Sequence, residues 1–494
     1  MQDAASQPFD LLIIGAGFAG VGLGREAMKA GFSNILILER SQRVGGTWRE
    51  NTYPGAACDV PSHLYSFSFA PNPDWSRLFA PQPEILDYIE RCATNFGLRP
   101  HIRFGTEVVR SNFDETTGLW TVHTASGDAF RTRFLVSGAG HALSKPALPA
   151  VKGLETFRGV TMHSAQWDPS VDLRGKRVAV IGTGASAMQL VPKVAEQAAQ
   201  LFVLQRTPGW LIPRPDFATP DVLKRTFRRL PVAQKLVRGL LYTYMEAFAV
   251  AYVLEPRLGR LREHGCKRYL YRTISDPEMR AKLTPNYRVG CKRILISSDY
   301  LPALKKPHVT LVAEALAELR EQTLVTAGGT ELAVDVIIFA TGFESPEEKP
   351  PVEAIGLQGR SLHDEMKASP KAYLGATLPG FPNMFLVLGP NTGLGHSSMI
   401  YMMESQFRYI VDAMKKSRTH GWTFADLKPE VMERYQVWVQ ERLKRTVWNA
   451  GGCASWYLSK DGRNAISWPD FTFAFRLRTR RFDDENYTRH AATR

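Results

Sequence analysis

The chain has 494 residues, 44% hydrophobic and 22% charged, which is typical of a soluble globular protein with roughly two to four domains. The net charge is +14, but no basic tail and no basic run interleaved with aromatics is present, so we expect no nucleic-acid partner. Part of this charge fits the binding of cofactor phosphates. Five scattered cysteines without a C-x-x-C pair exclude a zinc ribbon and a dithiol redox motif, so we expect no metal site and a reducing cytoplasm.

Two short apolar strands, at 10–14 and 177–181, each run into a glycine-rich turn. Continuous apolar runs are typical of buried parallel strands. In such a turn the glycines allow a tight bend, close approach of a pyrophosphate and close packing of helix on strand, while the helix N-terminus offers free N–H groups to the phosphates. Each turn therefore predicts a dinucleotide site. Its residues are Gly15, Gly17 and Gly20 in the first turn, and Gly182, Thr183, Gly184, Ser186 and Ala187 in the second.

The residue that follows the next strand predicts which dinucleotide binds. Glu39 follows the apolar strand 35–38, and a carboxylate there suits a free ribose 2′-hydroxyl. Arg206 follows the strand 201–204, and an arginine there suits the 2′-phosphate of NADP. Two dinucleotide sites in one chain suggest hydride transfer from a nicotinamide to a flavin. We therefore expect FAD at the first site and NADPH at the second.

The segments between and after the turns complete the expected organisation. A linker with prolines, 141–149, separates the first part from the second, and the Arg- and Leu-rich segment 213–286 has helical spacing. Within it, the apolar stretch 239–254 carries a central glutamate and is shorter than the ~20 residues that a membrane span requires. We expect a buried or amphipathic helix there, with peripheral membrane contact as the alternative. A third apolar strand, 334–340, fits a return of the chain to the first domain.

We therefore predict an α/β fold with two Rossmann-like dinucleotide-binding domains, for FAD and NADP, and an inserted helical subdomain. The expected boundaries are 1–144 and 337–494 for the two parts of the FAD-binding domain, 145–212 and 288–336 for the two parts of the NADP-binding domain, and 213–287 for the helical subdomain.

Three longer strings are more specific than the glycine turns. The first runs from Gly46-Thr47-Trp48 through Tyr53-Pro54-Gly55 to Asp59. The second runs from Phe157 through Gly159 and His163 to Trp167-Asp168, and the third from Leu283 to Cys291-Lys292-Arg293. In this order they resemble the fingerprints of type I Baeyer–Villiger monooxygenases, and the second is shared in looser form with other flavin-containing monooxygenases. The loop 389–398 and the tail around Trp456 resemble the branch that includes 4-hydroxyacetophenone monooxygenase. The resemblance covers nearly the whole chain.

The resemblance implies a reaction and a set of site residues. NADPH reduces FAD, reduced FAD and O2 form a C4a-peroxyflavin, and its attack on a ketone carbonyl yields an ester or lactone. Arg293 matches the arginine that stabilises the peroxide anion, and Asp59 matches the aspartate that tunes this arginine beside the flavin. The other matching FAD contacts are Gly46, Thr47, Trp48, Tyr65, Val108 and Met399. The implied NADP contacts are Gln189, Arg206, Thr207, Lys292 and Trp456.

Several alternatives stay open at this point. An S- or N-oxygenating flavin monooxygenase would use the same two cofactors, and a redox-sensing flavoprotein would bind them without turnover. A disulfide reductase would need a cysteine motif that this chain lacks. We expect His163 and Trp167 to serve as hinge and packing residues, and Cys58 and Cys291 to be small core groups. The segment 461–469 departs from the cyclohexanone-type pattern, so the ketone stays open, as does the oligomeric state.

Overall fold

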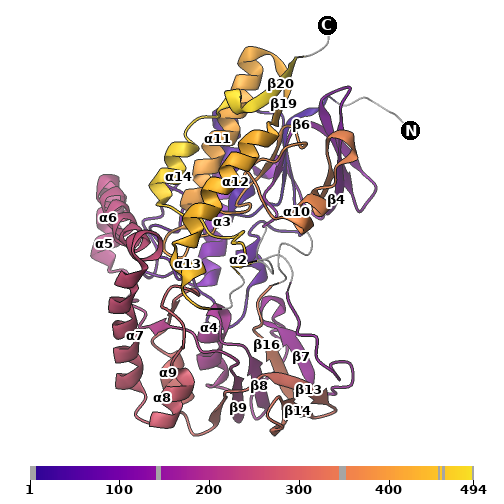
Figure 1. Cartoon of the computed structure of the whole chain (residues 1–494). Helices are drawn as coiled ribbons and strands as arrows, with labels where there is room; N and C mark the ends of the chain where they lie inside the picture. The colour runs from indigo at the N-terminus through magenta and orange to yellow at the C-terminus, as the bar shows by residue number, and fades with distance from the viewer. Residues whose placement is uncertain (1–6, 141–145, 344–351, 454–456, 459–461, 492–494) are drawn as a thin grey trace.

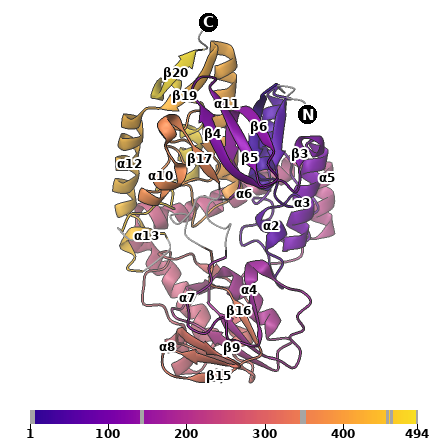
Figure 2. The same cartoon turned by 90° about the vertical axis from the view of Figure 1, so that its right-hand side faces the viewer.

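The computed structural model describes residues 7–140, 146–343, 352–453, 457–458 and 462–491. Two sheets lie at opposite ends of the molecule in both views (Figures 1 and 2). The first has the strand order β17-β4-β5-β6-β1-β2-β3, with β18 paired to β6, and the second has the order β12-β9-β8-β16-β7. These sheets and the helices around them confirm the predicted α/β class with two Rossmann-like units.

The first sheet is built on the first apolar strand of the sequence. β1 (Phe9–Ile14) pairs in parallel with β2 (Ile35–Leu38) and β6 (Ala129–Ser137), and β2 pairs with β3 (Ile102–Arg103). An antiparallel extension adds β4 and β5, and two late strands join the sheet after the chain returns from the second unit. Their bounds are β4 (Val108–Asp114), β5 (Leu119–Thr124), β17 (Glu353–Ile355) and β18 (Met384–Leu386).

The helices of the first unit pack on this sheet because glycines allow close approach. α1 (Phe18–Lys29) contacts α11 (Met399–His420), and a Cβ at Gly22 would lie 2.4 Å from the ring of Phe407. The fit of these two helices therefore depends on that glycine. The other helices of this unit are α2 (Thr47–Glu50), α3 (Gln82–Asn95), α10 (Leu362–Ala368), α12 (Pro429–Lys444), α13 (Val447–Ala450) and α14 (Thr472–Arg478). A separate antiparallel pair consists of β19 (Trp422–Leu427) and β20 (Tyr487–Ala491).

The second sheet is entirely parallel. Its strand β16 (Val336–Phe339) pairs along its whole length with β7 and β8, so the boundary that we expect between 336 and 337 falls inside this strand. The chain leaves the second unit only after Phe339. The other elements here are β7 (Val160–His163), β8 (Arg177–Ile181), α4 (Ala185–Val194), β9 (Gln200–Leu204), α9 (Tyr300–Leu304), β12 (Val309–Val312), β13 (Leu316–Arg320), β14 (Thr323–Thr326) and β15 (Glu331–Ala333), with the short pair β10 (Leu211–Ile212) and β11 (Leu295–Ile296) beside them.

A group of helices lies at one edge of the molecule, on the left in Figure 1. It consists of α5 (Asp221–Arg229), α6 (Pro231–Ala249) with a π-helical extension (Val250–Leu254), α7 (Gly259–Thr273) and α8 (Pro277–Leu283). All of them fall within the segment 213–287 that the sequence predicts to be helical. No helix in the described part of the chain is long and apolar enough to cross a membrane.

Candidate functional site

The first glycine turn joins β1 to α1 in the geometry that a dinucleotide requires. Gly15 has a φ of +97°, and a Cβ at Gly20 would lie 2.0 Å from the carbonyl oxygen of Gly15. Only glycine fits at either position. Gly17 precedes α1 and supplies no side-chain cap, so the first N–H groups of this helix are left for another acceptor.

Glu39 is the buried acid of this site, with 4% of its surface exposed. Its Oε2 accepts a hydrogen bond from Ala16 N at 2.8 Å, and its Oε1 accepts from Ser41 N at 2.9 Å and from Arg49 at 3.1 Å. A carboxylate has about four acceptor positions, so one remains on Oε2 for a hydroxyl donor. The carboxylate is therefore held in place beside the glycine turn, as a ribose contact requires.

The string that begins at Gly46 lies against the same turn. A Cβ at Gly46 would lie 3.3 Å from Gly17 Cα, so the two backbones approach closely. Trp48 Nε1 donates a hydrogen bond to the hydroxyl of Tyr65 at 3.1 Å, and burial raises the pKa of this tyrosine. Gly46, Thr47, Trp48 and Tyr65 are thus brought together beside the first turn. Val108 is buried at the start of β4.

The loop before α11 carries buried polar atoms that have no hydrogen-bond partner among the described residues. They are Asn391 Oδ1, both ring nitrogens of His396, and the hydroxyls of Ser397 and Ser398. Buried polar groups are normally paired, so this cluster fits a polar ligand. Met399 begins α11, whose N-terminus has no side-chain cap and favours negative charge. The loop and helix therefore fit the polar edge of a flavin.

The second glycine turn differs from the first in its charge and exposure. Nothing would contact a Cβ at Gly184, which precedes the uncapped helix α4. The hydroxyl of Thr183 donates to the carbonyl of Thr207 at 3.2 Å, which ties the turn to the end of β9. Arg206 is exposed, and burial together with the charge of Arg206 lowers the pKa of Lys292. The two predicted phosphate-binding cations are therefore close together at this turn.

Gln189 joins the two nucleotide units. Its Oε1 accepts from the hydroxyl of Tyr53 at 3.0 Å, and its Nε2 donates to the carbonyl of Ala57 at 2.9 Å. Gly55, with a φ of +84°, allows this loop to approach α4, since a Cβ there would lie 2.6 Å from Gln189 O. The side-chain amide of Gln189 thus bonds to the loop 53–57 of the first unit. Besides the NADP contact that the resemblance implies, Gln189 therefore helps to position the two units.

Asp59 and Arg293 form an ion pair although they are 234 positions apart. Arg293 Nη2 donates to Asp59 Oδ1 at 2.6 Å. The charge of Asp59 raises the pKa of Arg293, with smaller contributions from Tyr457, Cys58 and Tyr65. The arginine side chain is 48% exposed, so part of its guanidinium is open to a ligand. The pair brings a residue of the first unit and one of the second to one point.

The interpretation of Cys291 as a small core group is incomplete. Cys291 is buried, as expected, but its sulfur forms a disulfide with Cys453, across a Cα–Cα distance of 6.2 Å. Partners 162 positions apart leave no local spacing signal, which is why the sequence pattern did not indicate the bond. Cys58 is buried and free, as expected, and burial raises the pKa of its thiol. The loop that carries Arg293 is therefore linked covalently to the C-terminal segment.

The remaining predicted residues lie at the edges of the site or outside the described chain. His163 ends β7 and is buried, its Nδ1 accepts from Ala165 N at 3.1 Å, and its ring lies 5.9 Å from that of Phe343. It therefore packs against the segment that leaves the second sheet, which suits a hinge. Trp456 lies outside the described residues. No group of three or more His, Cys, Asp or Glu side chains in the described part could hold a metal ion.

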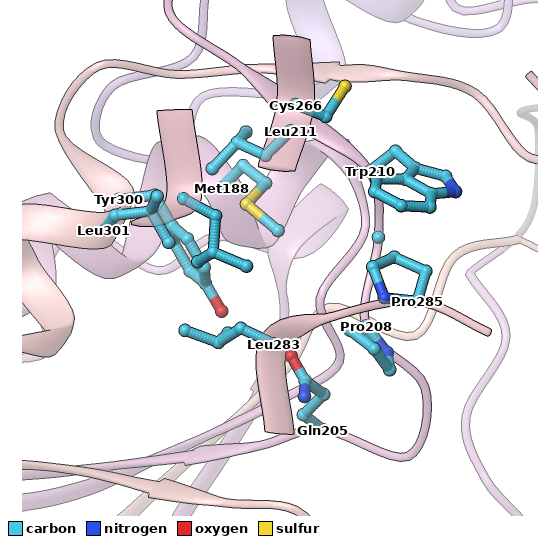
Figure 3. A pocket seen from close by; sticks show the side chains of 12 residues that line it. Met188, Gln205, Pro208, Trp210, Leu211, Cys266, Leu283, Pro285, Tyr300 and Leu301 are labelled. Carbon is cyan, nitrogen blue, oxygen red and sulfur yellow. The ribbon is translucent and has the colours of Figure 1, made fainter. Parts of the chain in front are cut away.

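A small cavity of about 20 Å³ lies between α4, β9 and the helical subdomain (Figure 3). Its walls are mostly apolar, with Met188, Trp210 and Leu283 among the lining side chains. Neither Asp59 nor Arg293 lines it. The pocket is therefore separate from the site that the ion pair marks.

Comparison with known proteins places this geometry in a family. Residues 10–255 match the model of the flavin-binding monooxygenase-like family. The chain is 45% identical to a Baeyer–Villiger monooxygenase of Pseudomonas aeruginosa over 98% of this chain and 92% of the relative. It is 48% identical to a Baeyer–Villiger monooxygenase of Streptomyces coelicolor over 96% of this chain and 91% of the relative.

A solved structure agrees with these relatives. OTEMO, solved in complex with FAD and NADP, superposes with a TM-score of 0.85 at 26% identity, over 95% of this chain and 97% of that one. Both glycine turns and the Asp59–Arg293 pair lie within the region that the curated relatives share with this chain. The protein therefore belongs to the flavin-binding monooxygenase-like family and, within it, to the Baeyer–Villiger monooxygenases.

Proposed function

We propose that this protein inserts one oxygen atom of O2 next to the carbonyl carbon of a ketone, giving an ester or lactone, with FAD at the first glycine turn and NADPH at the second. The observation that carries this proposal is the 2.6 Å ion pair between Asp59 and Arg293. It positions a permanent cation where the two nucleotide units meet, and such a cation is what an oxygen-centred anion needs.

When bound and reduced by NADPH, FAD supplies the activated oxygen. Arg293 stays charged across the physiological range, since Asp59 raises a pKa that is already high, and it stabilises negative charge on the reacting oxygen. Asp59 fixes the orientation of the guanidinium. The uncapped N-terminus of α11 would hold the polar edge of the flavin and favour negative charge there.

The nicotinamide cofactor is held by the second unit. Arg206 and Lys292 form a cationic pair that suits the 2′-phosphate of NADPH. The uncapped N-terminus of α4 offers N–H groups to the pyrophosphate. The hydrogen bonds of Gln189 to the loop 53–57 hold this unit against the first, and would thereby help to bring the nicotinamide near the flavin.

Arg293→Ala tests the assignment. We expect ester formation to fall by about 10²- to 10³-fold, because a positioned electrostatic partner of the reacting oxygen is lost. Reduction of the bound flavin by NADPH, followed anaerobically by its absorbance, should be nearly unchanged. Arg174→Ala, an exposed arginine near β8, is the matched control and should behave like the parent protein. A normal ester yield from Arg293→Ala would refute the assignment.

A panel of cyclic, aryl and long-chain ketones, with sulfides alongside, tests the substrate class. Esters or lactones should form with consumption of NADPH and O2. Sulfoxides without any ester would show that the protein oxygenates heteroatoms and not ketones. NADPH consumption that yields only hydrogen peroxide would contradict both ketone and heteroatom oxygenation.

A further inference from the structure

The helix α6 has its polar and apolar sides in an unusual arrangement. The side that faces the protein carries the polar residues Gln234, Arg238 and Glu246 beside Tyr242, Met245 and Ala249, which pack against the core. The side that faces solvent carries Val232, Leu236, Leu240 and Tyr244, which are 61%, 65%, 71% and 61% exposed. We call these four residues the outer stripe. A surface helix of a globular protein normally directs polar and charged residues to solvent, so an exposed apolar row of this length is unusual.

The polar residues on the inner side are fully engaged, so this orientation of α6 is fixed. Gln234 Nε2 donates to the carbonyl of Asn72 at 2.7 Å, and Arg238 donates to the carbonyls of His63 and Ser66 at 2.7 and 3.0 Å. Glu246 accepts from the hydroxyl of Thr472 at 2.8 Å. Rotating the helix to bury the outer stripe would break these bonds and leave buried polar groups unpaired, which is costly. The stripe therefore remains outside in the folded protein.

The surroundings of the stripe are basic. Residues 221–249, which span α5 and α6, contain six Lys or Arg and two Asp or Glu, and Arg238 and Glu246 among them point inward. Arg225, Arg229 and Lys235 are exposed and form no ion pair with any residue that the structure describes. Two other basic residues of α5 are paired, Lys224 with Asp221 and Arg228 with Asp74. An apolar stripe flanked by free cations suits a surface that offers both hydrocarbon and negative charge.

We propose that α5 and α6 dock on an anionic lipid surface, with the outer stripe buried at the boundary of headgroups and acyl chains and with Arg225, Arg229 and Lys235 bound to lipid phosphates. A second copy of the chain fits this surface less well, because a two-fold axis through the stripe would place the same basic residues opposite one another. The two helices lie at the left edge of the molecule in Figure 1, away from both sheets. Docking there leaves the glycine turns uncovered, and it does not depend on the proposed function.

Vesicle flotation with the FAD-loaded full chain tests the proposal. We expect it to float with vesicles of phosphatidylcholine and phosphatidylglycerol, and far less with phosphatidylcholine alone. The double variant Leu236→Ser, Leu240→Ser should partition into the mixed vesicles about a hundredfold less, since two leucines no longer leave water. Val437→Ser, Leu477→Ser is the matched control, because these side chains are 65% and 64% exposed on α12 and α14. It should float like the parent protein.

A charge variant separates the two parts of the interaction. Arg225→Glu, Arg229→Glu should weaken binding to mixed vesicles and make the remaining binding less sensitive to salt, whereas Lys152→Glu, Arg158→Glu, in the second unit, should do neither. All variants should keep the FAD content and NADPH oxidation rate of the parent, which shows that they are folded.

Three results would overturn the proposal. The first is no flotation of the parent protein with mixed vesicles. The second is equal flotation of the outer-stripe variant and the parent, which would mean that net charge alone drives binding. The third is a dimer in light scattering that the outer-stripe variant abolishes, without vesicle binding by the parent, which would assign the stripe to a second copy of the chain.

Discussion

The two nucleotide units use the same strand–turn–helix opening but surround it with opposite chemistry. The first unit places a buried carboxylate, Glu39, beside its turn and holds it with two backbone N–H groups and Arg49. The second places an exposed cation, Arg206, beside its turn, with Lys292 close by. A ligand enclosed by buried groups leaves only when its site opens, whereas surface cations exchange their partner readily. We infer that the first unit retains its cofactor and the second exchanges it.

The largest expected effect comes from adding a methyl group to each turn. Gly20→Ala forces a Cβ against the carbonyl of Gly15, so the purified protein should lack flavin absorbance or fail to fold. Gly184→Ala meets nothing in the chain, so FAD content should be unchanged while the KM for NADPH rises about tenfold, because a pyrophosphate must approach that backbone. Equal loss of FAD in both variants would contradict the proposed difference between the two glycine turns.

The disulfide gives the next largest effect, on stability. Cys453→Ser removes the bond between the loop that carries Arg293 and the C-terminal segment, and should lower the free energy of unfolding by about 3 kcal/mol. Urea unfolding of the parent protein, with and without a thiol reductant, should reproduce this difference. The variant itself should not respond to the reductant. A parent protein that is equally stable with and without the reductant would show that the bond does not form in solution.

Arg206→Ala should then change cofactor preference. Loss of a charge-assisted contact with the 2′-phosphate should raise the KM for NADPH about thirtyfold and leave that for NADH nearly unchanged. Arg174→Ala, an exposed arginine of the same unit, is the control. An unchanged ratio of the two Michaelis constants would place recognition of the 2′-phosphate elsewhere.

The smallest expected effect is on pH dependence. Burial and the charge of Arg206 lower the pKa of Lys292, so this lysine loses its proton at a lower pH than an ordinary one. NADPH binding should therefore weaken as the pH rises through this lowered pKa. In Arg206→Ala one of the two causes is gone, so the alkaline limb of 1/KM for NADPH should move to higher pH. If the pH at which 1/KM for NADPH falls is the same in Arg206→Ala and the parent protein, Lys292 is not the titrating group.

The repeating features of the fold were predictable from the sequence. The strands before both turns, the acid and arginine after them and the helical segment each have a local pattern, and local patterns follow from local geometry. The last strand of the second sheet could not be assigned from the sequence, because an apolar pattern predicts a buried strand but not the sheet to which it belongs. The strand Val336–Phe339 pairs with β7 and β8 rather than starting the return to the first unit.

The contacts between distant residues were harder to predict. Asp59 and Arg293 were paired only through the family resemblance, since no spacing rule relates positions 234 apart. The Cys291–Cys453 bond and the hydrogen bonds of Gln189 to the first unit depend on how the two units meet, which neither turn encodes. The spacing of Val232, Leu236, Leu240 and Tyr244 predicts an apolar side of a helix, but it does not say whether the protein covers that side.

The division of the ion pair between two units has a consequence for control of the reaction. Because Asp59 belongs to one unit and Arg293 to the other, a rotation of the units against each other would separate aspartate and arginine. Asp59 would therefore orient the guanidinium of Arg293 only while the unit that binds NADPH is docked on the unit that binds FAD. If Arg293 acts as we propose, oxygen transfer to the ketone would require the docked arrangement of the two units.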